Sequence, residues 1–325
     1  MRIVFMGTPD FAEGILQSLI DSEHQVIAVY TQPDRPQGRK AELTPPPVKV
    51  LAERAGIPVY QPVRIRRPKW VVLLTEQAPD LIVVAAFGQI LPPSILSIAP
   101  CINVHASLLP KYRGSSPIQR AIAAGDTETG VTIMRMDEGM DTGNILYRQI
   151  VPITAQDTGK SLFDKLAAVG QEALVPVLGQ FAAGEDPQGI PQDSALATYA
   201  PMLSREDGRL DFTVSAHLLD CHVRAFTPWP STFTNWEERQ VKILQVSVFT
   251  EEPVLPGVDP GHVLTREEAG RIGASAEHRI LVQTGCGILE ILRLQLPGKK
   301  PLPADAFLRG YPLWGCRLGS SSADE

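Results

Sequence analysis

The sequence predicts an α/β protein that begins with an open, mostly parallel, Rossmann-like sheet and ends in a smaller β-barrel. Three observations lead to this fold class. Apolar runs of strand length alternate with helix-like stretches through the first half of the chain, which is the pattern of βαβ units. Short strand-like runs punctuated by glycine occupy the last third. The chain has 325 residues, more than a single core usually fills, so two domains are expected.

Four apolar runs in the first half are expected to form the sheet; they span residues 3–6, 26–30, 81–86 and 102–105. Strands joined through helices run parallel, and open sheets of this kind place their sites at the carboxyl ends of the strands. Functional residues should therefore follow these runs. The first run leads into Gly7-Thr8-Pro9-Asp10-Phe11, which is only half of a GxGxxG fingerprint. A structural strand-to-helix turn is therefore favoured over a dinucleotide site.

The second half of the chain contains the expected boundary between the two domains. Helical spacing of apolar residues predicts a helix over 159–181, and the Gly-, Pro- and Ser-rich stretch 184–209 has the composition of a linker. A short amphipathic helix follows between Val214 and Ala225, and then come strand-like runs at 241–249, 279–283 and 287–294. We expect a first domain over residues 1–189, a linker over 190–208 and a barrel domain over 209–325.

The composition narrows the classes of function. Hydrophobic residues make up 44% and charged residues 20%, as in a globular protein. The start lacks the features of a signal peptide and no apolar run reaches membrane-spanning length, so we expect a cytoplasmic protein. The cysteines, Cys101, Cys221, Cys286 and Cys316, form no CxxC pair that would indicate zinc or a disulfide framework. The net charge of −6 argues against an extensive nucleic-acid-binding surface but allows a local basic patch.

Two polar side chains interrupt the apolar run at 102–105. Alternate residues of a strand face the same way, so Asn103 and His105 share one face while Ile102 and Val104 face the packing. An amide donor beside an imidazole suits acyl transfer, because one stabilises the oxyanion while the other donates or moves a proton. The pair could instead satisfy backbone groups, and the spacing alone does not decide between these interpretations.

The flanking segments favour the catalytic interpretation. Residues 107–110 and 112–114 form an irregular loop directly after the strand, and residues 137–143 form an acidic, glycine-bearing turn. An aspartate of that turn, if it meets His105, would orient the ring and stabilise its charged form. The turn could also be a solvated hairpin.

Taken together, these segments resemble the signature of the 10-formyltetrahydrofolate-dependent formyltransferases. The resemblance rests on Asn103-Val104-His105-Ala106-Ser107-Leu108-Leu109-Pro110 and the later Asp141-Thr142-Gly143. Four more segments are similar to the family members that act on methionyl-tRNA: 7–12, 31–36, 117–120 and 224–230. The likeness spans nearly the whole chain and fades only in 251–276 and after Trp314.

The resemblance implies a reaction and the residues that perform it. Asn103 and His105 would flank the formyl group, and Asp141 would hold His105 in its working state. An amine would attack the formyl carbon directly, with no acyl-enzyme and no metal. The donor, 10-formyltetrahydrofolate, would bind against two segments, Phe87, Gly88, Gln89, Ile90, Leu91 and Pro92, and Ser107, Leu108, Leu109 and Pro110.

The implied acceptor is methionine on initiator tRNA, and a monomer is expected. The proline-rich loop 32–48 matches a family loop that enters the acceptor end of the tRNA; Arg39 falls on the family's important arginine, although Lys40-Ala41-Glu42 is less basic than the family run. The last domain resembles an oligonucleotide-binding-like barrel. The expected tRNA contacts are Arg35, Arg39, Lys40, Lys299 and Lys300.

Two alternatives remain open on the sequence. A sugar-nucleotide formyltransferase would keep the same catalytic core, and activity on a free sugar nucleotide would identify it. A non-catalytic tRNA-binding protein would keep the barrel and the basic loop. Such a protein has no use for Asn103, His105 and Asp141 together.

Overall fold

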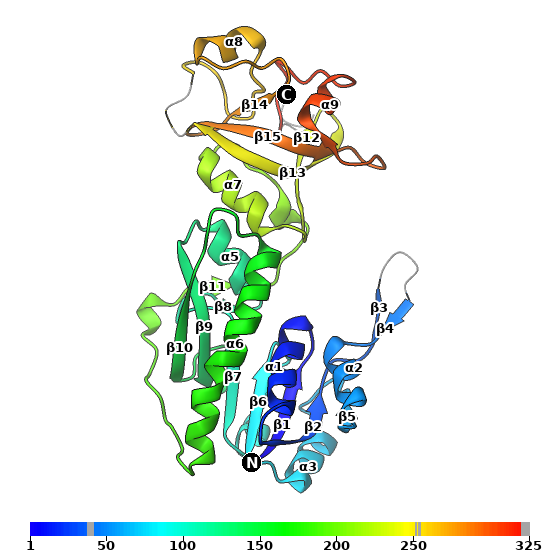
Figure 1. Cartoon of the computed structure of the whole chain (residues 1–325), viewed down its shortest axis with the longest axis vertical. Helices are drawn as coiled ribbons and strands as arrows, with labels where there is room; N and C mark the ends of the chain where they lie inside the picture. Colours follow the sequence, from blue (N-terminus) through cyan, green and yellow to red (C-terminus); the bar gives the residue numbers. More distant parts are fainter. Residues whose placement is uncertain (38–41, 251, 253–254, 320–325) are drawn as a thin grey trace. The chain divides into compact units, whose positions relative to one another are not determined.

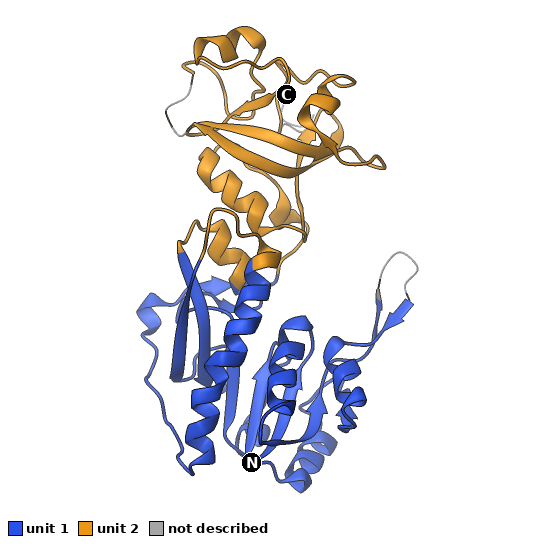
Figure 2. Cartoon of the chain, viewed as in Figure 1, with its two compact units in different colours: residues 1–117, 128–152, 162–202 blue, residues 118–127, 153–161, 203–325 orange. Residues whose placement is uncertain are grey.

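The computed structural model describes residues 1–37, 42–250, 252 and 255–319. The chain divides into two compact units (Figure 2). Unit 1 comprises residues 1–117, 128–152 and 162–202, and unit 2 comprises residues 118–127, 153–161 and 203–325. Arg39 and Lys40 lie outside the described residues.

The elements of unit 1 follow one another as strands separated by helices (Figure 1). They are β1 (Arg2–Gly7), α1 (Asp10–Ile20), β2 (Gln25–Tyr30), β3 (Arg35–Gln37), β4 (Glu42–Thr44), α2 (Pro47–Arg54), β5 (Val59–Tyr60), α3 (Pro68–Gln77), β6 (Leu81–Ala85), α4 (Pro93–Leu96), β7 (Cys101–His105), β8 (Arg113–Gly114), β9 (Glu128–Arg135), β10 (Ile145–Pro152), α6 (Gly159–Ala182, its first three residues in unit 2), η1 (Ser194–Leu196) and β11 (Tyr199–Ala200).

The main sheet of unit 1, counted over the described residues, has seven strands in the order β10-β9-β7-β6-β1-β2-β5. The strands β5, β2, β1, β6 and β7 run parallel, whereas β9 and β10 are antiparallel additions at one edge. The predicted open, mostly parallel sheet is confirmed. The four predicted strands lie in β1, β2, β6 and β7, while β9 and β10 are not among the strands that the apolar runs indicate.

Helices cover both faces of this sheet, which is why its central strands are buried almost throughout. Side chains of one face, such as Val4 and Met6 of β1, pack with Leu74 of α3 and Ile95 of α4. On the other face Gly170 of α6 lies so close that an added Cβ would sit 3.2 Å from Val104 of β7.

The turn after β1 is a point of close approach between chain segments. A Cβ added to Gly7 would lie 2.6 Å from the Cβ of Ala12 and 2.9 Å from the carbonyl oxygen of Ala85. Glycine is therefore required at this position by the packing of α1 and β6 against β1. This supports the structural interpretation of the turn.

Unit 2 consists of short strands and small helices. Its elements are α5 (Pro117–Ala123, with Pro117 in unit 1), η2 (Glu206–Gly208), α7 (Ala216–Ala225), β12 (Thr232–Trp236), β13 (Arg239–Thr250), α8 (Arg266–Arg271), β14 (Ile280–Gln283), β15 (Ile288–Gln295), β16 (Leu302–Pro303) and α9 (Ala304–Leu308). Ser215 caps helix α7, since its side chain accepts a hydrogen bond from the backbone N–H of Leu218.

The antiparallel sheet of unit 2 closes into a small barrel. The strands run in the order β12-β13-β15-β14, with β16 on β15. Two short segments then link the edges: Val263 bridges Val282 of β14, His262 bridges Arg317, and Leu318 bridges Trp236 of β12. The interior is apolar, with side chains such as Ile243, Leu289 and Phe307 buried in one cluster. The predicted C-terminal barrel is confirmed.

Asp207 connects η2 to α5 inside unit 2. Arg120 Nη2 lies 2.6 Å from Asp207 Oδ1, and the backbone N–H and hydroxyl of Ser204 donate to Oδ2 at 2.8 and 2.7 Å. Burial alone would raise the pKa of the Asp207 carboxyl, but the Ser204 donors and the Arg120 guanidinium outweigh it and lower the pKa to about 2. The ionised carboxylate therefore stabilises the fold.

Replacing Asp207 with asparagine should lower the free energy of unfolding by about 2 kcal/mol at neutral pH. Because the pKa is lower in the folded than in the unfolded chain, this stabilisation is present above about pH 4 and is lost as the pH falls toward 2. Urea denaturation of wild type and Asp207→Asn at pH 7, 4 and 3 measures the difference. A difference that stays constant down to pH 3 would contradict the assignment.

Candidate active site

Asn103 and His105 are polar residues inside a buried strand. All five residues of β7 are buried, and Asn103 and His105 are only 8% and 5% exposed. Pairing of Val84 with Asn103 places the carboxyl end of β6 beside that of β7, at the edge where parallel sheets hold their sites. Both side chains reach Asp141, so the structure brings the three predicted catalytic residues together.

The ring of His105 has an acceptor at each nitrogen. Its Nε2 lies 3.0 Å from the carbonyl oxygen of Tyr112, and its Nδ1 lies 3.7 Å from Asp141 Oδ2. Since a carbonyl can only accept, Nε2 carries the hydrogen of that contact. The ring orientation is thereby fixed, with Nδ1 on the side of the Asp141 carboxylate.

Asp141 lies in a tight turn that presents its carboxylate to both residues. Its backbone is left-handed, with φ of 55°, a conformation that aspartate tolerates better than most residues. Oδ2 accepts a hydrogen bond of 2.8 Å from the backbone N–H of Gly114, and Oδ1 lies 3.5 Å from Asn103 Nδ2. The longer contact leaves the Asn103 amide available to another acceptor.

Hydrogen bonds from neighbouring residues fix the conformation of the predicted folate loop 107–110. Ser107 is buried, and its hydroxyl donates to the carbonyl of Lys111 at 2.6 Å. The hydroxyl of Thr132 donates to the carbonyl of Ser107 and accepts from the N–H of Leu109. Leu109 is buried as well, whereas Leu108 and Pro110 are half-buried. Contact with a ligand would therefore come from Leu108, Pro110 and the backbone.

The second predicted folate segment, 87–92, follows β6. The carbonyl of Phe87 accepts from Gln32 Nε2 at 3.0 Å and from Thr8 Oγ1 at 3.3 Å, so this group is already engaged. Phe87 and Leu91 are buried in the core, and Pro92 precedes α4. Gly88 has φ of 76°, and Ile90 is 74% exposed.

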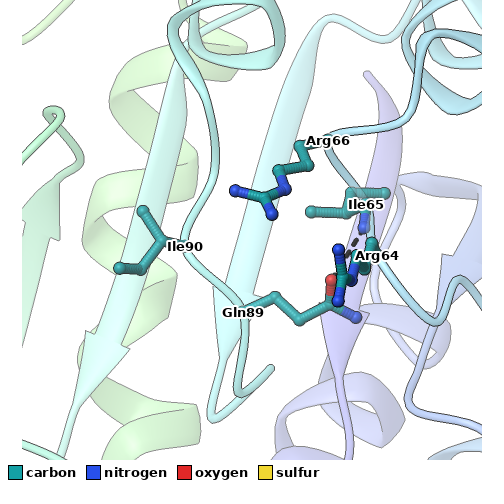
Figure 3. A pocket seen from close by; sticks show the side chains of 5 residues that line it. All are labelled: Arg64, Ile65, Arg66, Gln89 and Ile90. Atoms are coloured by element: carbon teal, nitrogen blue, oxygen red, sulfur yellow. Dashed lines mark hydrogen bonds between the residues drawn. The ribbon is translucent and has the colours of Figure 1, made fainter.

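A hollow of about 320 Å³ lies beside this segment, lined by Arg64, Ile65, Arg66, Gln89 and Ile90 (Figure 3). The Gln89 amide shapes it, because Oε1 accepts from the N–H of Ile65 at 2.7 Å and Nε2 donates to the carbonyl of Pro62 at 2.8 Å. The hollow combines apolar surface with two guanidinium groups. The guanidinium groups can bind carboxylates, and the isoleucine side chains can contact an apolar part of a ligand.

The described residues among the predicted tRNA contacts are exposed but lie in different units. Arg35, in β3 of unit 1, donates weakly to Gln32 Oε1 at 3.4 Å. Lys299 and Lys300 lie in an exposed turn after β15 of unit 2. Asp34 anchors the base of the β3 and β4 hairpin by binding Gln61 and Lys49, and these two hydrogen bonds lower the pKa of its carboxyl.

Arg113 and Gln192, which lie beside the turn that carries Asp141, have no counterpart in the sequence predictions. Arg113 is 3% exposed, and both its Nε and Nη2 donate to Gln192 Oε1. Gln192 in turn reaches the turn that carries Asp141. Arg113 lies in a segment noted only for its shape, and Gln192 lies in the predicted linker, so no local pattern points to either.

The described chain offers no group of three or more His, Cys, Asp or Glu side chains arranged to hold a metal ion. Within the same residues no helix combines the length and the apolar character needed to cross a bilayer.

Most of the chain matches two protein-family models. The formyl transferase model matches residues 1–178, and the model of the formyl transferase C-terminal domain matches residues 202–312. The chain belongs to the formyl transferase family. The family resemblance predicted from the motifs around Asn103 and Asp141 is thereby confirmed.

A formyl transferase relative matches along its full length. The methionyl-tRNA formyltransferase of Geotalea daltonii is 47% identical over 326 aligned positions, covering 99% of this chain and 100% of the relative.

Solved formyl transferases share the fold at low identity. WlaRD, a sugar 3N-formyl transferase solved with dTDP and 5-N-formyl-THF, has a TM-score of 0.65 at 18% identity and covers 92% of this chain and 99% of its own. The N-formyltransferase from Helicobacter canadensis, solved with folinic acid and dTDP-3-aminofucose, has a TM-score of 0.62 at 17% identity and covers 90% and 98%. HypX from Aquifex aeolicus, in complex with tetrahydrofolic acid, has a TM-score of 0.59 at 19% identity; the match covers 95% of this chain but only 47% of HypX, so the chain spans about half of that protein.

Proposed function

We propose that this chain transfers the formyl group of 10-formyltetrahydrofolate to the amino group of methionine on initiator methionyl-tRNA, in the cytoplasm and as a monomer, for translation initiation. The observation that carries the proposal is the match to a methionyl-tRNA formyltransferase at 47% identity over 99% of this chain. That match includes the C-terminal unit. Residues 1–189 would carry catalysis and residues 209–325 would bind the tRNA, with 190–208 joining them.

The site suits a direct transfer. The methionine nitrogen attacks the formyl carbon, and the negative charge that develops on the formyl oxygen is stabilised by Asn103 Nδ2 and by a protonated Nδ1 of His105, since Nε2 of that ring already donates to Tyr112. The attacking nitrogen gives up a proton toward Asp141 or water, the bond from the formyl carbon to N10 of the folate breaks, and N10 gains a proton. Asn103 Nδ2 and His105 Nδ1 lie 3.5 and 3.7 Å from the two carboxylate oxygens of Asp141, so a single substrate position can reach all three residues.

The hollow beside Gln89 fits the donor. A folate has a planar ring system and a glutamyl tail with two carboxylates, and the hollow offers isoleucine surface together with Arg64 and Arg66. The segments 87–92 and 107–110 follow β6 and β7, whose carboxyl ends are adjacent. We therefore place the folate donor along this edge of the sheet.

One assay tests the proposal. Purified protein is incubated with 10-formyltetrahydrofolate and each of four acceptors: methionyl initiator tRNA, methionyl elongator tRNA, free methionine and a dTDP-linked amino sugar. Formylation of the initiator tRNA alone is expected. Preferred formylation of the amino sugar would overturn the proposal in favour of a sugar enzyme, and tRNA binding without any formyl transfer would favour a binding protein.

Arg39 provides a second test, which rests on the sequence since this residue lies outside the described chain. An arginine on the acceptor-end loop can contact phosphate in a bidentate manner that lysine does not reproduce. Arg39→Lys should lower kcat/KM for methionyl-tRNA, and Arg39→Ala should lower it further, with the salt dependence of tRNA binding reduced by about one phosphate contact. Arg54→Ala, which removes an exposed charge from α2, is the control. Unchanged kinetics in both Arg39 variants would refute the assignment.

A further inference from the structure

The turn that carries Asp141 is tied to a buried arginine through the side chain of Gln192. Arg113 Nε and Nη2 donate to Gln192 Oε1 at 3.1 and 2.8 Å. Gln192 Nε2 donates to the carbonyls of Asp141 and Gly143 at 2.9 and 2.7 Å. The backbone N–H of Gly114, next to Arg113 in the chain, donates to Asp141 Oδ2. These contacts form a closed ring that begins and ends at Asp141, and all of its members belong to unit 1.

The orientation of the Gln192 amide follows from its partners. A guanidinium can only donate and a carbonyl can only accept, so the amide oxygen must face Arg113 and the amide nitrogen must face the turn. Among side chains of this length, glutamine supplies both an acceptor and a donor. Glutamate could keep the contact with Arg113, but its oxygens would oppose the carbonyls of Asp141 and Gly143.

The turn that Gln192 holds contains a left-handed residue and a closely packed glycine. Asp141 has φ of 55°, in the left-handed region that is unfavourable for residues with a side chain. Gly143 packs so closely that an added Cβ would lie 1.7 Å from the carbonyl oxygen of Arg135. The two bonds from Gln192 bracket Thr142, between these positions. These two hydrogen bonds therefore help to hold the backbone conformation that directs the Asp141 carboxylate toward His105.

We propose that Gln192 is a positioning residue for formyl transfer, which holds Asp141 against His105 and is itself held by Arg113. The inference rests on the proposed role of Asp141. It gives the segment between α6 and β11 a part in the reaction, because a side chain of that segment sets the geometry of the site.

Gln192→Ala and Gln192→Glu separate this role from a merely structural one. If Gln192 served only to pair the buried Arg113, Gln192→Glu would act like wild type, since a carboxylate accepts from a guanidinium at least as well. If it positions Asp141, both variants should lower kcat by about 10- to 100-fold, because small displacements of catalytic groups have effects of that size. The KM values for the folate donor and for methionyl-tRNA should change less than about threefold, as expected when a transition-state contact is lost.

Two further comparisons complete the test. Gln188→Ala, on the same segment, loses the side-chain hydrogen bonds to Asp186 and should keep wild-type kcat. In an Asp141→Ala background there is no carboxylate to place, so adding Gln192→Glu should lower kcat no further.

The outcomes distinguish the inference from the proposed function. An active wild type with an equally active Gln192→Glu, or a further tenfold fall in the Asp141→Ala background, would overturn the positioning role alone. Failure of the wild type to formylate methionyl-tRNA would overturn the proposed function and this inference with it. Thermal unfolding midpoints show which variants fold. If Gln192→Ala does not fold, Gln192→Glu decides, since it retains the partner of Arg113.

Discussion

Replacing His105 with alanine should lower kcat for formylation of methionyl-tRNA by about two to three orders of magnitude, and Asn103→Ala should have an effect of similar size. Both side chains sit at the carboxyl end of β7 with little exposure. In this water-poor setting, a donor aimed at a developing oxyanion stabilises the transition state more than it would at the surface. Steady-state kinetics with saturating donor and tRNA measures the loss.

Binding provides the contrast that identifies a catalytic effect. Affinity for methionyl-tRNA should hardly change in either variant, because the lost interactions form mainly in the transition state. His278→Ala, an exposed histidine of unit 2, serves as the control for loss of an imidazole. A variant that keeps near-normal kcat would remove its residue from the mechanism.

Asp141→Asn should lower kcat by about two orders of magnitude, although the shape of the side chain is kept. The amide oxygen can still accept from the N–H of Gly114, but the charge opposite His105 Nδ1 is gone and no carboxylate remains to take a proton. The measurement is kcat as a function of pH. An Asp141→Asn profile with the same shape and height as that of wild type would eliminate the assignment.

The matched control comes from the same turn. Glu138 is an exposed carboxylate three residues earlier, and Glu138→Gln removes the same charge from the same segment. This variant should leave both kcat and its pH profile unchanged. If Glu138→Gln were as damaging as Asp141→Asn, the general field of the acidic turn would explain the effect, and no specific partnership with His105 would be needed.

The parallel core of the sheet could be predicted because its strands are buried on both faces and therefore read as continuous apolar runs. The strand β10 could not, since half of its residues are exposed and Tyr147, Arg148 and Gln149 interrupt its apolar pattern. The barrel was foreseeable as a set of short strands, but its closure depends on single bridges between distant residues such as Trp236 and Leu318. No local periodicity marks such contacts.

The site, like the fold, could be predicted from the sequence only in part. Asn103 and His105 stand out because they are polar residues in an apolar strand, and the family signature supplies Asp141. Arg113 and Gln192 are 79 positions apart, and what joins them is complementary hydrogen bonding rather than any repeat in the chain. Composition predicts a linker over residues 184–209, but it does not show which side chain of that stretch reaches the turn that carries Asp141.

The way the barrel closes has a consequence for shortened versions of the protein. The match to the C-terminal family model ends at residue 312, yet residues 317 and 318 supply the bridges to His262 and Trp236. A chain cut at 312 would keep every named strand and most of the apolar interior, but it would leave β12 and the segment around His262 with unpaired backbone donors and acceptors. Open sheet edges of this kind pair with other copies and promote aggregation. Residues 313–319 thus complete the wall of the barrel. We expect the closed barrel to form only when this stretch is present.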